Sequence, residues 1–249
     1  MKAAIVRPPR FALEAGAIDG RVAQVSGHEL HHMREVMRLG PGGAVRLIAP
    51  DGTEFAGQIG HYRDDHAVIE ITGILEPDPA RARIILAAAI IKGPRMDFLV
   101  EKAAELGAAA LWPLECARAV VRKPGLERIA RWRRLVIAAT KQSLASCEME
   151  IRPPMAVAEA AREVPKETLA VYCTEGAEPL GAIVRRMRPR GILIACGPEG
   201  DFDAAEYATM RAAGFAAAGL GPNRLRSETA ALAALSLAAG ALDEIDKGI

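Results

Sequence analysis

Apolar and polar positions alternate in short runs over the first third of the chain. Four runs predict strands: AAIVR (3–7), GAVRLIAPDG (43–52), TEFAGQIG (53–60) and HAVIEITGIL (66–75). One helix is expected between the first run and the second. Pro-Asp-Gly at 50–52 lies between two of these runs and is typical of a hairpin. The pattern predicts a small β-barrel or sheet over residues 1–74.

The pattern changes after residues 75–83, where two prolines stand among charged residues and predict a linker. From residue 84 onward, continuous apolar runs alternate with helical stretches. Expected strands are 84–91, 109–114, 169–173, 192–196 and 215–220; expected helices are 94–106, 126–144, 179–188, 203–213 and 227–242. Such alternation predicts an α/β domain over 84–249, with a parallel sheet covered on both faces.

The composition predicts a large hydrophobic core and no membrane-spanning helix. The chain has 249 residues, 51% of them hydrophobic, and no apolar run reaches the roughly 18 to 20 residues of a spanning helix. The basic N-terminus is not followed by an apolar segment, so we expect no signal peptide and a soluble, cytoplasmic protein. No CxxC spacing is present, which favours buried thiols over disulfides or metal ligands at Cys116, Cys147, Cys173 and Cys196.

Charge is nearly balanced overall, at +1, but is unevenly distributed. Between Arg118 and Lys141 there are eight basic residues and a single acid, Glu127. This stripe is consistent with an electrostatic footprint for phosphates and equally with a solvated helix face.

The segment His28-Glu29-Leu30-His31-His32 matches the HExxH pattern of zinc peptidases. A structural role is the better interpretation, because Ser26 and Glu29 have the spacing of a capping box. A helical projection places Leu30, Met33, Val36 and Met37 on the buried face and the histidines 28 and 32 on the solvated one. We therefore expect no metal site, and a zinc peptidase stays only as an alternative.

Two strand-to-helix junctions carry Gly-Pro. ILIACGPEGDFDAAE ends a strand at Cys196 and starts a helix with a capping box at Asp203 and Glu206. LGPNRLRSETAA, from Leu220, has the same design. Either junction alone is consistent with plain turn geometry, but backbone amides there can also bind a polar ligand. In open α/β sheets, ligands bind at the carboxyl ends of the strands.

These two loops resemble the signature loops of the ribosomal RNA small subunit methyltransferase E family, SPOUT-class enzymes that methylate N3 of a uridine in 16S rRNA. KGPRMDFLVEKAAELGAAALWPL (92–114), ATKQS (139–143) and HHMREVMRLGPGGAVRL (31–47) are similar as well. The resemblance covers nearly the whole chain. It implies a PUA-like β-barrel over 1–74, a trefoil-knot domain over 84–249, a homodimer, and 16S rRNA or the small ribosomal subunit as partner.

The resemblance also implies a cofactor, S-adenosylmethionine, held in the knot by three loops. Carried over by position, its binding residues are Thr174, Glu175, Gly176, Gly197, Pro198, Glu199, Gly200, Leu220, Gly221, Leu225 and Arg226. Backbone groups in these loops are expected to hold the adenine.

Catalysis is assigned to Arg226 and Glu228. A fixed cation beside the uridine stabilises the negative charge that develops on O2 and O4 when N3 loses its proton. The alternative for Arg226 is an ion pair with Glu228 or another acid at the helix start. Candidate RNA-binding residues are Arg7, Arg10, Arg34, Arg38, Arg118, Arg122, Lys123 and Arg224.

The chain departs from the family pattern in three places. Asn223 stands where the family has arginine, Asp201 where it has glycine, and Leu144 and Ala145 where basic residues and a proline are usual. A SPOUT relative acting on another RNA is therefore the second functional hypothesis.

Overall fold

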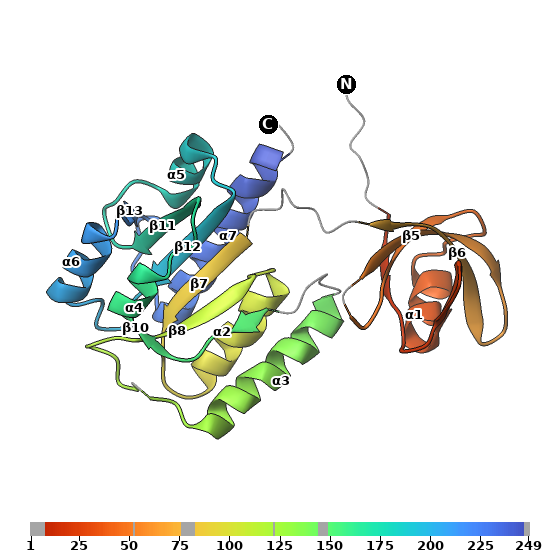
Figure 1. Ribbon diagram of the computed structural model, residues 1–249, viewed down its shortest axis with the longest axis horizontal. Coiled ribbons are helices and arrows are strands. Elements are labelled where there is room, and N and C mark those ends of the chain that lie inside the picture. The colour runs from red at the N-terminus through yellow and green to blue at the C-terminus, as the bar shows by residue number, and fades with distance from the viewer. Residues whose placement is uncertain (1–7, 52, 76–82, 122, 144–148, 247–249) are drawn as a thin grey trace. The chain divides into compact units, whose positions relative to one another are not determined.

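The structure is a computed structural model that describes residues 8–51, 53–75, 83–121, 123–143 and 149–246. The chain divides into two compact units (Figure 1). The smaller comprises residues 1–78 with 144–147, and the larger comprises residues 79–143 with 148–249. No helix in the described ranges is both long and apolar enough to cross a membrane.

The smaller unit is a curved sheet around one core. In its described part the sheet has six strands in the order β1-β4-β5-β6-β3-β2. β1 pairs with β4 in parallel, and the other pairs are antiparallel. The strands are β1 (Arg10–Ala12), β2 (Ile18–Asp19), β3 (Val22–Ser26), β4 (Ala44–Ile48), β5 (Glu54–Tyr62) and β6 (His66–Leu75).

The predicted hairpin is present between β4 and β5, where the Ala49 amide donates to the Thr53 carbonyl at 2.9 Å. The strands β1, β2 and β3 were not predicted. β1 and β2 have three and two residues, and runs that short carry little periodicity. β3 has five residues, as many as the predicted β4, and its alternating burial was overlooked. The predicted strand 3–7 lies outside the described residues.

The helix of the smaller unit corrects two predictions. Helix α1 (Gly27–His31) gives way to a π-helical turn, η1 (His32–Val36). Because π-helical bonds run from i to i+5, the 3.6-residue stripe breaks, and Val36 and Met37 are 63% and 41% exposed instead of buried. Ser26 is the N-cap residue, but its side chain makes no capping hydrogen bond, so the predicted capping box is wrong.

The larger unit has a parallel sheet, as predicted. Its described strands run β10-β8-β7-β12-β11-β13, with β9 also paired to β8, and every pairing is parallel. The strands are β7 (Arg83–Ala89), β8 (Ala110–Glu115), β9 (Glu150–Ile151), β10 (Met155–Ala156), β11 (Thr168–Cys173), β12 (Gly191–Cys196) and β13 (Ala216–Ala218).

Helices cover both faces of this sheet (Figure 1). One face packs against α2 (Pro94–Glu105), α3 (Leu126–Ser143), α5 (Leu180–Met187) and α7 (Ser227–Asp246). The other packs against α4 (Val157–Arg162) and α6 (Ala204–Ala212). In β12, Ile192 and Ile194 are buried on the first face and Leu193 on the second, so apolar residues follow one another without a polar break.

Candidate functional site

A pocket of about 430 Å³ opens at the carboxyl ends of β12, β11 and β13. These three strands are neighbours in a parallel sheet, so the loops that follow them meet at one edge. The pocket is lined by Cys173, Thr174, Glu175, Cys196, Gly197, Pro198, Glu199, Asp201, Leu220, Gly221, Asn223, Arg224, Leu225, Ser227 and Ala230. Its volume lies in the usual range for small-molecule sites.

The loop after β12 is fixed by its own hydrogen bonds. A Cβ atom on Gly197 would lie 3.2 Å from the Phe202 ring and amide, so only glycine fits there without displacement. Asp201 has φ of +63°, a conformation that glycine and aspartate tolerate best. Its Oδ1 accepts from the Phe202 amide at 2.8 Å and from the Tyr207 hydroxyl at 2.7 Å. Asp201 therefore replaces the expected glycine with a carboxylate that closes the turn.

The helix after this loop begins with the predicted capping box. Asp203 Oδ1 accepts from the Glu206 amide at 2.7 Å, and Glu206 Oε2 accepts from the Asp203 amide at 2.8 Å. The second oxygen, Glu206 Oε1, accepts from the Ala117 amide at 2.8 Å and so ties α6 to the segment after β8. The loop at the pocket is thereby held from both ends.

The loops after β11 and β13 approach each other closely. The Thr174 amide donates to the Ala218 carbonyl at 3.0 Å, and the Gly219 amide donates to the Glu178 carbonyl at 2.7 Å. A Cβ on Gly219 would lie 2.5 Å from the Ala177 carbonyl oxygen, so the contact requires glycine. Backbone groups, rather than particular side chains, shape this wall of the pocket.

The charged lining is mainly acidic. The lining contains the carboxylates of Glu175, Glu199 and Asp201 and one guanidinium, that of Arg224, which lies 3.9 Å from Glu175 in an exposed pair. Such a wall suits a ligand that carries net positive charge.

A second guanidinium links the pocket to the start of α7. Arg95, in the first turn of α2, lies 3.0 Å from Glu199 and 3.7 Å from Glu228. Glu228 is 8% exposed, and its Oε2 is buried with no hydrogen-bond partner in the described structure. Arg95 was not predicted. Its position just after the central strand β7 was the available signal, because functional groups gather at strand carboxyl ends.

Of the cofactor residues predicted from the resemblance, the structure brings eight into the pocket wall. They are Thr174, Glu175, Gly197, Pro198, Glu199, Leu220, Gly221 and Leu225. Gly176, Gly200 and Arg226 are not part of the lining. Six further lining residues were not predicted to bind the cofactor or RNA: Cys173, Cys196, Asp201, Asn223, Ser227 and Ala230. The cysteines end apolar strands and Ala230 lies in an alanine-rich helix, and both settings are typical of a core.

Arg226 immediately precedes α7, and its carbonyl accepts from the Ala230 amide at 2.7 Å. Its side chain is exposed and makes no ion pair with any described residue. The alternative of an Arg226–Glu228 pair is therefore wrong, because Glu228 lies beside Arg95 instead.

The predicted RNA-binding residues are scattered among different settings. Arg34 pairs with Glu35 at 2.9 Å, Arg38 is exposed, and Lys123 is exposed. Arg118 donates to the Gly200 carbonyl at 3.1 Å, so it also supports the loop after β12. Arg7 and Arg122 lie outside the described residues.

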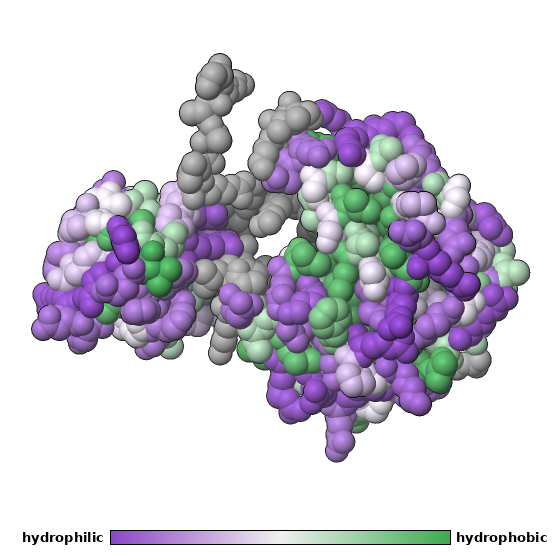
Figure 2. All heavy atoms as spheres, turned by 180° about the vertical axis from the view of Figure 1, so that it is seen from behind, coloured by the Kyte–Doolittle hydropathy of each residue, from purple (hydrophilic) through white to green (hydrophobic). Residues whose placement is uncertain are grey.

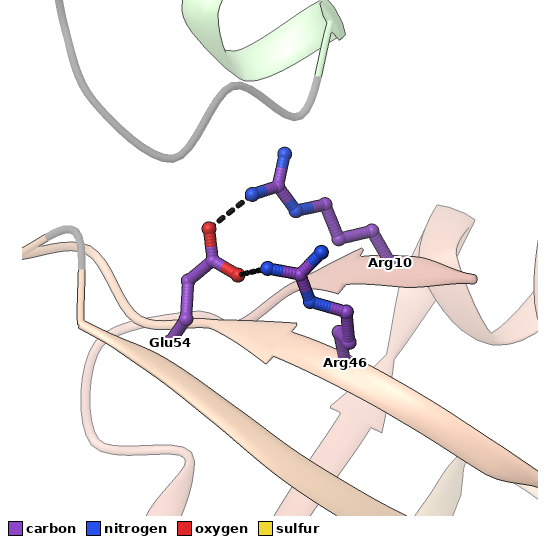
Figure 3. A network of polar contacts seen from close by, with 3 residues as sticks. All are labelled: Arg10, Arg46 and Glu54. Atoms are coloured by element: carbon purple, nitrogen blue, oxygen red, sulfur yellow. Dashed lines mark hydrogen bonds and ion pairs between the residues drawn. The ribbon is translucent and has the colours of Figure 1, made fainter. Parts of the chain in front are cut away.

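Arg10 belongs to a polar network in the smaller unit (Figure 3). Arg10 and Arg46 are register partners on β1 and β4, and each donates to a different oxygen of Glu54. Glu54 is 8% exposed, whereas the arginines are partly accessible. Two guanidiniums therefore share the carboxylate of Glu54.

The described residues contain no group of three or more His, Cys, Asp or Glu side chains that could hold a metal ion. His28 and His31 are exposed, and His32 stacks edge-on to Phe11 with ring centroids 6.1 Å apart. The switch to π-helix after His31 also changes the geometry on which the HExxH motif depends. The described structure gives the zinc alternative no support.

The chain is similar to known proteins over the regions that form the pocket. Residues 78–239 match the family described as RNA methyltransferase domain. The Ribosomal RNA small subunit methyltransferase E of Bacillus subtilis (strain 168) is 29% identical over 226 residues, which are 85% of this chain and 87% of that protein. The protein of the same description from Mycobacterium tuberculosis (strain CDC 1551 / Oshkosh) is 29% identical over 233 residues, covering 87% of this chain and 85% of its own.

A solved structure covers still more of the chain. It is the crystal structure of a Ribosomal RNA small subunit methyltransferase E from Neisseria gonorrhoeae bound to S-adenosyl methionine. It is 31% identical, covers 92% of this chain and 96% of its own, and superposes with a TM-score of 0.63. The similarity therefore includes both units and the pocket.

Proposed function

We propose, from the premise that the chain belongs to the ribosomal RNA small subunit methyltransferase E family of RNA methyltransferases, that it methylates N3 of a uridine in 16S rRNA with S-adenosylmethionine as donor. The observation that carries this proposal is the pocket at the ends of β12, β11 and β13, in which both signature loops meet. The proposed site of action is the cytoplasm, on the small ribosomal subunit.

The residues of the pocket fit the donor. S-adenosylmethionine carries a net positive charge, and the three carboxylates of the wall outnumber the two nearby guanidiniums, Arg224 in the lining and Arg95 beside Glu199. Leu220, Leu225 and Pro198 supply apolar surface for an adenine, beside backbone amides and carbonyls. When bound, the donor supplies an electrophilic methyl group. The predicted residues outside the lining, Gly176, Gly200 and Arg226, are proposed to support the loops or to face the RNA.

Methylation at N3 of uridine places two requirements on the site: access to the base and stabilisation of negative charge. N3 lies on the Watson–Crick edge of uridine, so the base must be unpaired or flipped to reach the pocket. Loss of the N3 proton leaves negative charge on O2 and O4. Arg226 is proposed to stabilise that charge, because its guanidinium is exposed beside the pocket and free of carboxylates among the described residues.

Glu228 is the second catalytic candidate. Its carboxylate is nearly buried and lies beside Arg95, so holding Arg95 in place competes with a role as proton acceptor. Glu228→Gln separates the two roles, because glutamine can still accept a hydrogen bond from Arg95 but cannot take up the N3 proton. A proton acceptor predicts loss of turnover at unchanged donor affinity; weaker donor binding would indicate the structural role instead.

A homodimer is part of the proposal. Figure 2 shows hydrophobic side chains gathered on one face of the larger unit. Phe98 on α2 and Leu237 on α7 are 48% and 43% exposed, and these two helices pack together. Sedimentation of the wild type as a dimer, and of Phe98→Glu as a monomer, is the expected result. A trefoil knot in the larger unit and a PUA-like role for the smaller one complete the proposal.

Donor binding is tested by calorimetric titration with S-adenosylmethionine. Ala230 lines the pocket, so Ala230→Leu is expected to weaken binding by filling it. Ala233→Leu, one turn further along α7 and outside the lining, is the matched control. Absence of binding to the wild type would reject the methyltransferase proposal. Binding combined with an unaltered 16S rRNA would move the target to another RNA.

A further inference from the structure

Two cysteines lie side by side at the inner end of the pocket. Cys173 ends β11 and Cys196 ends β12, one position beyond the paired residues Tyr172 and Ala195. Their sulfur atoms are 3.6 Å apart, and both residues line the pocket. Sequence analysis treated them as unrelated core thiols, because 22 residues separate them in the chain.

The two thiols differ in environment. Cys196 is 2% exposed, whereas Cys173 is partly accessible. The Cys196 thiol donates to the Cys173 sulfur, and this hydrogen bond, together with burial, raises the pKa of Cys196 well above its usual value. Cys196 therefore keeps its proton, and Cys173 is the sulfur of the pair that a reagent in the pocket can reach. One accessible sulfur supported by a buried partner is the arrangement of an attacking and a resolving thiol.

The backbone geometry allows the two sulfurs to bond. Neighbouring strands lie about 4.7–4.9 Å apart, within the roughly 4.4–6.8 Å that a disulfide spans between Cα atoms. Both side chains lie on the same face of the sheet, against the core shared with α7. Closing the sulfur separation to about 2.05 Å therefore requires side-chain rotation rather than movement of the strands.

We propose that Cys173 and Cys196 form an oxidisable dithiol in the pocket, converted to a disulfide by hydroperoxides. The Cys173 thiolate attacks one oxygen of hydrogen peroxide, the O–O bond breaks, and a sulfenic acid forms on Cys173. The departing hydroxide takes up the proton that the Cys173 thiol had released and leaves as water. The Cys196 sulfur then attacks the Cys173 sulfur, the S–O bond breaks, and the hydroxyl leaves as a second water with the Cys196 proton. Two thiols are oxidised and one hydrogen peroxide is reduced to two waters.

The disulfide has a consequence for the ligand, which rests on the function proposed above. Thr174 and Gly197, which follow the two cysteines directly, line the donor pocket. Rotating both sulfurs toward each other changes the wall between these residues. Oxidation is therefore expected to weaken donor binding at least tenfold, and bound donor is expected to slow oxidation by shielding Cys173.

The sequence makes the disulfide easy to locate. Trypsin places the four cysteines on four different peptides, residues 103–118, 142–162, 167–185 and 191–211. The full-length protein is treated with hydrogen peroxide, free thiols are blocked with N-ethylmaleimide, and the digest is analysed by mass spectrometry without reduction. The expected product is 167–185 linked to 191–211, released by dithiothreitol and formed at least tenfold more slowly with S-adenosylmethionine present.

Single variants and an internal control complete the test. In Cys196→Ser the peptide 167–185 should gain oxygen, as sulfenic or sulfinic acid, instead of forming a link. Cys116, buried on the opposite face of the sheet, should stay reduced. A link between other peptides, or oxygen addition to Cys173 in the wild type without a link, would contradict the proposal that Cys173 and Cys196 form an oxidisable dithiol.

The outcome for the donor is read separately. Reduced protein that binds no S-adenosylmethionine would remove the proposed function while the peptide link still decides the dithiol. Reduced and oxidised proteins that bind the donor equally would refute the effect of oxidation on the pocket.

Discussion

At the scale of single residues, catalysis is expected to depend most on Arg226. A cation at developing negative charge is worth much more in a desolvated site than in water, so the exposed Arg226 is expected to act once the bound RNA covers its guanidinium. Arg226→Ala is therefore predicted to lower kcat about 10²- to 10³-fold at unchanged donor affinity. Methyl transfer from labelled S-adenosylmethionine to small ribosomal subunits gives the rate. Arg190→Ala, a side chain that is 88% exposed in its contact with Glu167, is the matched control; equal rates for both variants would remove Arg226 from the mechanism.

Tyr207 gives a prediction in the alkaline range. Burial, followed by the hydrogen bond to Asp201, raises the pKa of Tyr207 to about 12. Below pH ~10 the phenol is protonated in the folded and unfolded states alike, and its contribution to stability is fully present. Between that pH and about 12 only the unfolded chain releases the proton, so the free energy of unfolding falls as pH rises.

Urea unfolding at a series of pH values from about 9 to 12 measures this effect. Tyr207→Phe keeps the edge-on ring contacts with Tyr172 and Phe202 but has no proton to lose, so its stability should fall less over the same range. Parallel curves for the variant and the wild type would contradict the assignment.

Particular residues show where sequence reasoning was sufficient and where it failed. Glycines and a capping box located the loop after β12, because turn chemistry is local. Arg95 could not be assigned in the same way, since its two carboxylate neighbours come from segments about 100 and 130 residues away in the chain. The Cys173–Cys196 contact could not be predicted for the same reason. Contacts between strands depend on sheet order, which no local pattern contains.

At the scale of elements, Asp97 joins α2 to α3. Its Oδ1 accepts from the buried Trp132 indole at 3.1 Å, and its Oδ2 lies 2.8 Å from Arg131. Asp97→Ala leaves the indole N–H without this partner in the core, at an expected cost of about 1–3 kcal/mol in the free energy of unfolding.

Asp97→Asn is the matched variant. It keeps an acceptor for Trp132 and loses only the charge beside the exposed Arg131, which is expected to cost about 0–1 kcal/mol. Denaturant unfolding followed by circular dichroism compares the two. Equal losses would mean that the charge, and not the buried hydrogen bond, joins the helices.

Helices and strands were predicted correctly where the hydrophobic pattern extended over many residues. The prediction failed where an element was very short or where the helical period changed. The α/β half was predictable because its central strands are buried on both faces and its helices, apart from α4, have eight or more residues. In the smaller unit, β1 and β2 are too short to show a period. Val36 was expected in the core, but the π-helical turn rotates it outward, and no sequence signal predicted that change of period.

At the scale of the whole molecule, we expect the larger unit to bind the donor and the smaller unit to contribute to RNA binding. Every lining residue of the pocket belongs to the larger unit. A protein comprising residues 79–249 is therefore predicted to bind S-adenosylmethionine with an affinity within about threefold of the full chain, a difference below 0.7 kcal/mol. It is also predicted to lose methylation of small subunits, because it lacks the basic side chains of the smaller unit, such as Arg34 and Arg38. Calorimetry and the methylation assay measure the two properties; full activity of the fragment would contradict the division.

The most direct measurement of the proposed activity is the mapping of methylated nucleotides in 16S rRNA by mass spectrometry. Small subunits from cells lacking the protein are incubated with purified protein and S-adenosylmethionine, and the rRNA is digested and compared with an untreated sample. The expected result is one uridine that gains a methyl group at N3, absent when Arg226→Ala replaces the wild type. A methyl group at another atom or base, or no methylation of 16S rRNA by a protein that binds the donor, would contradict the proposed activity.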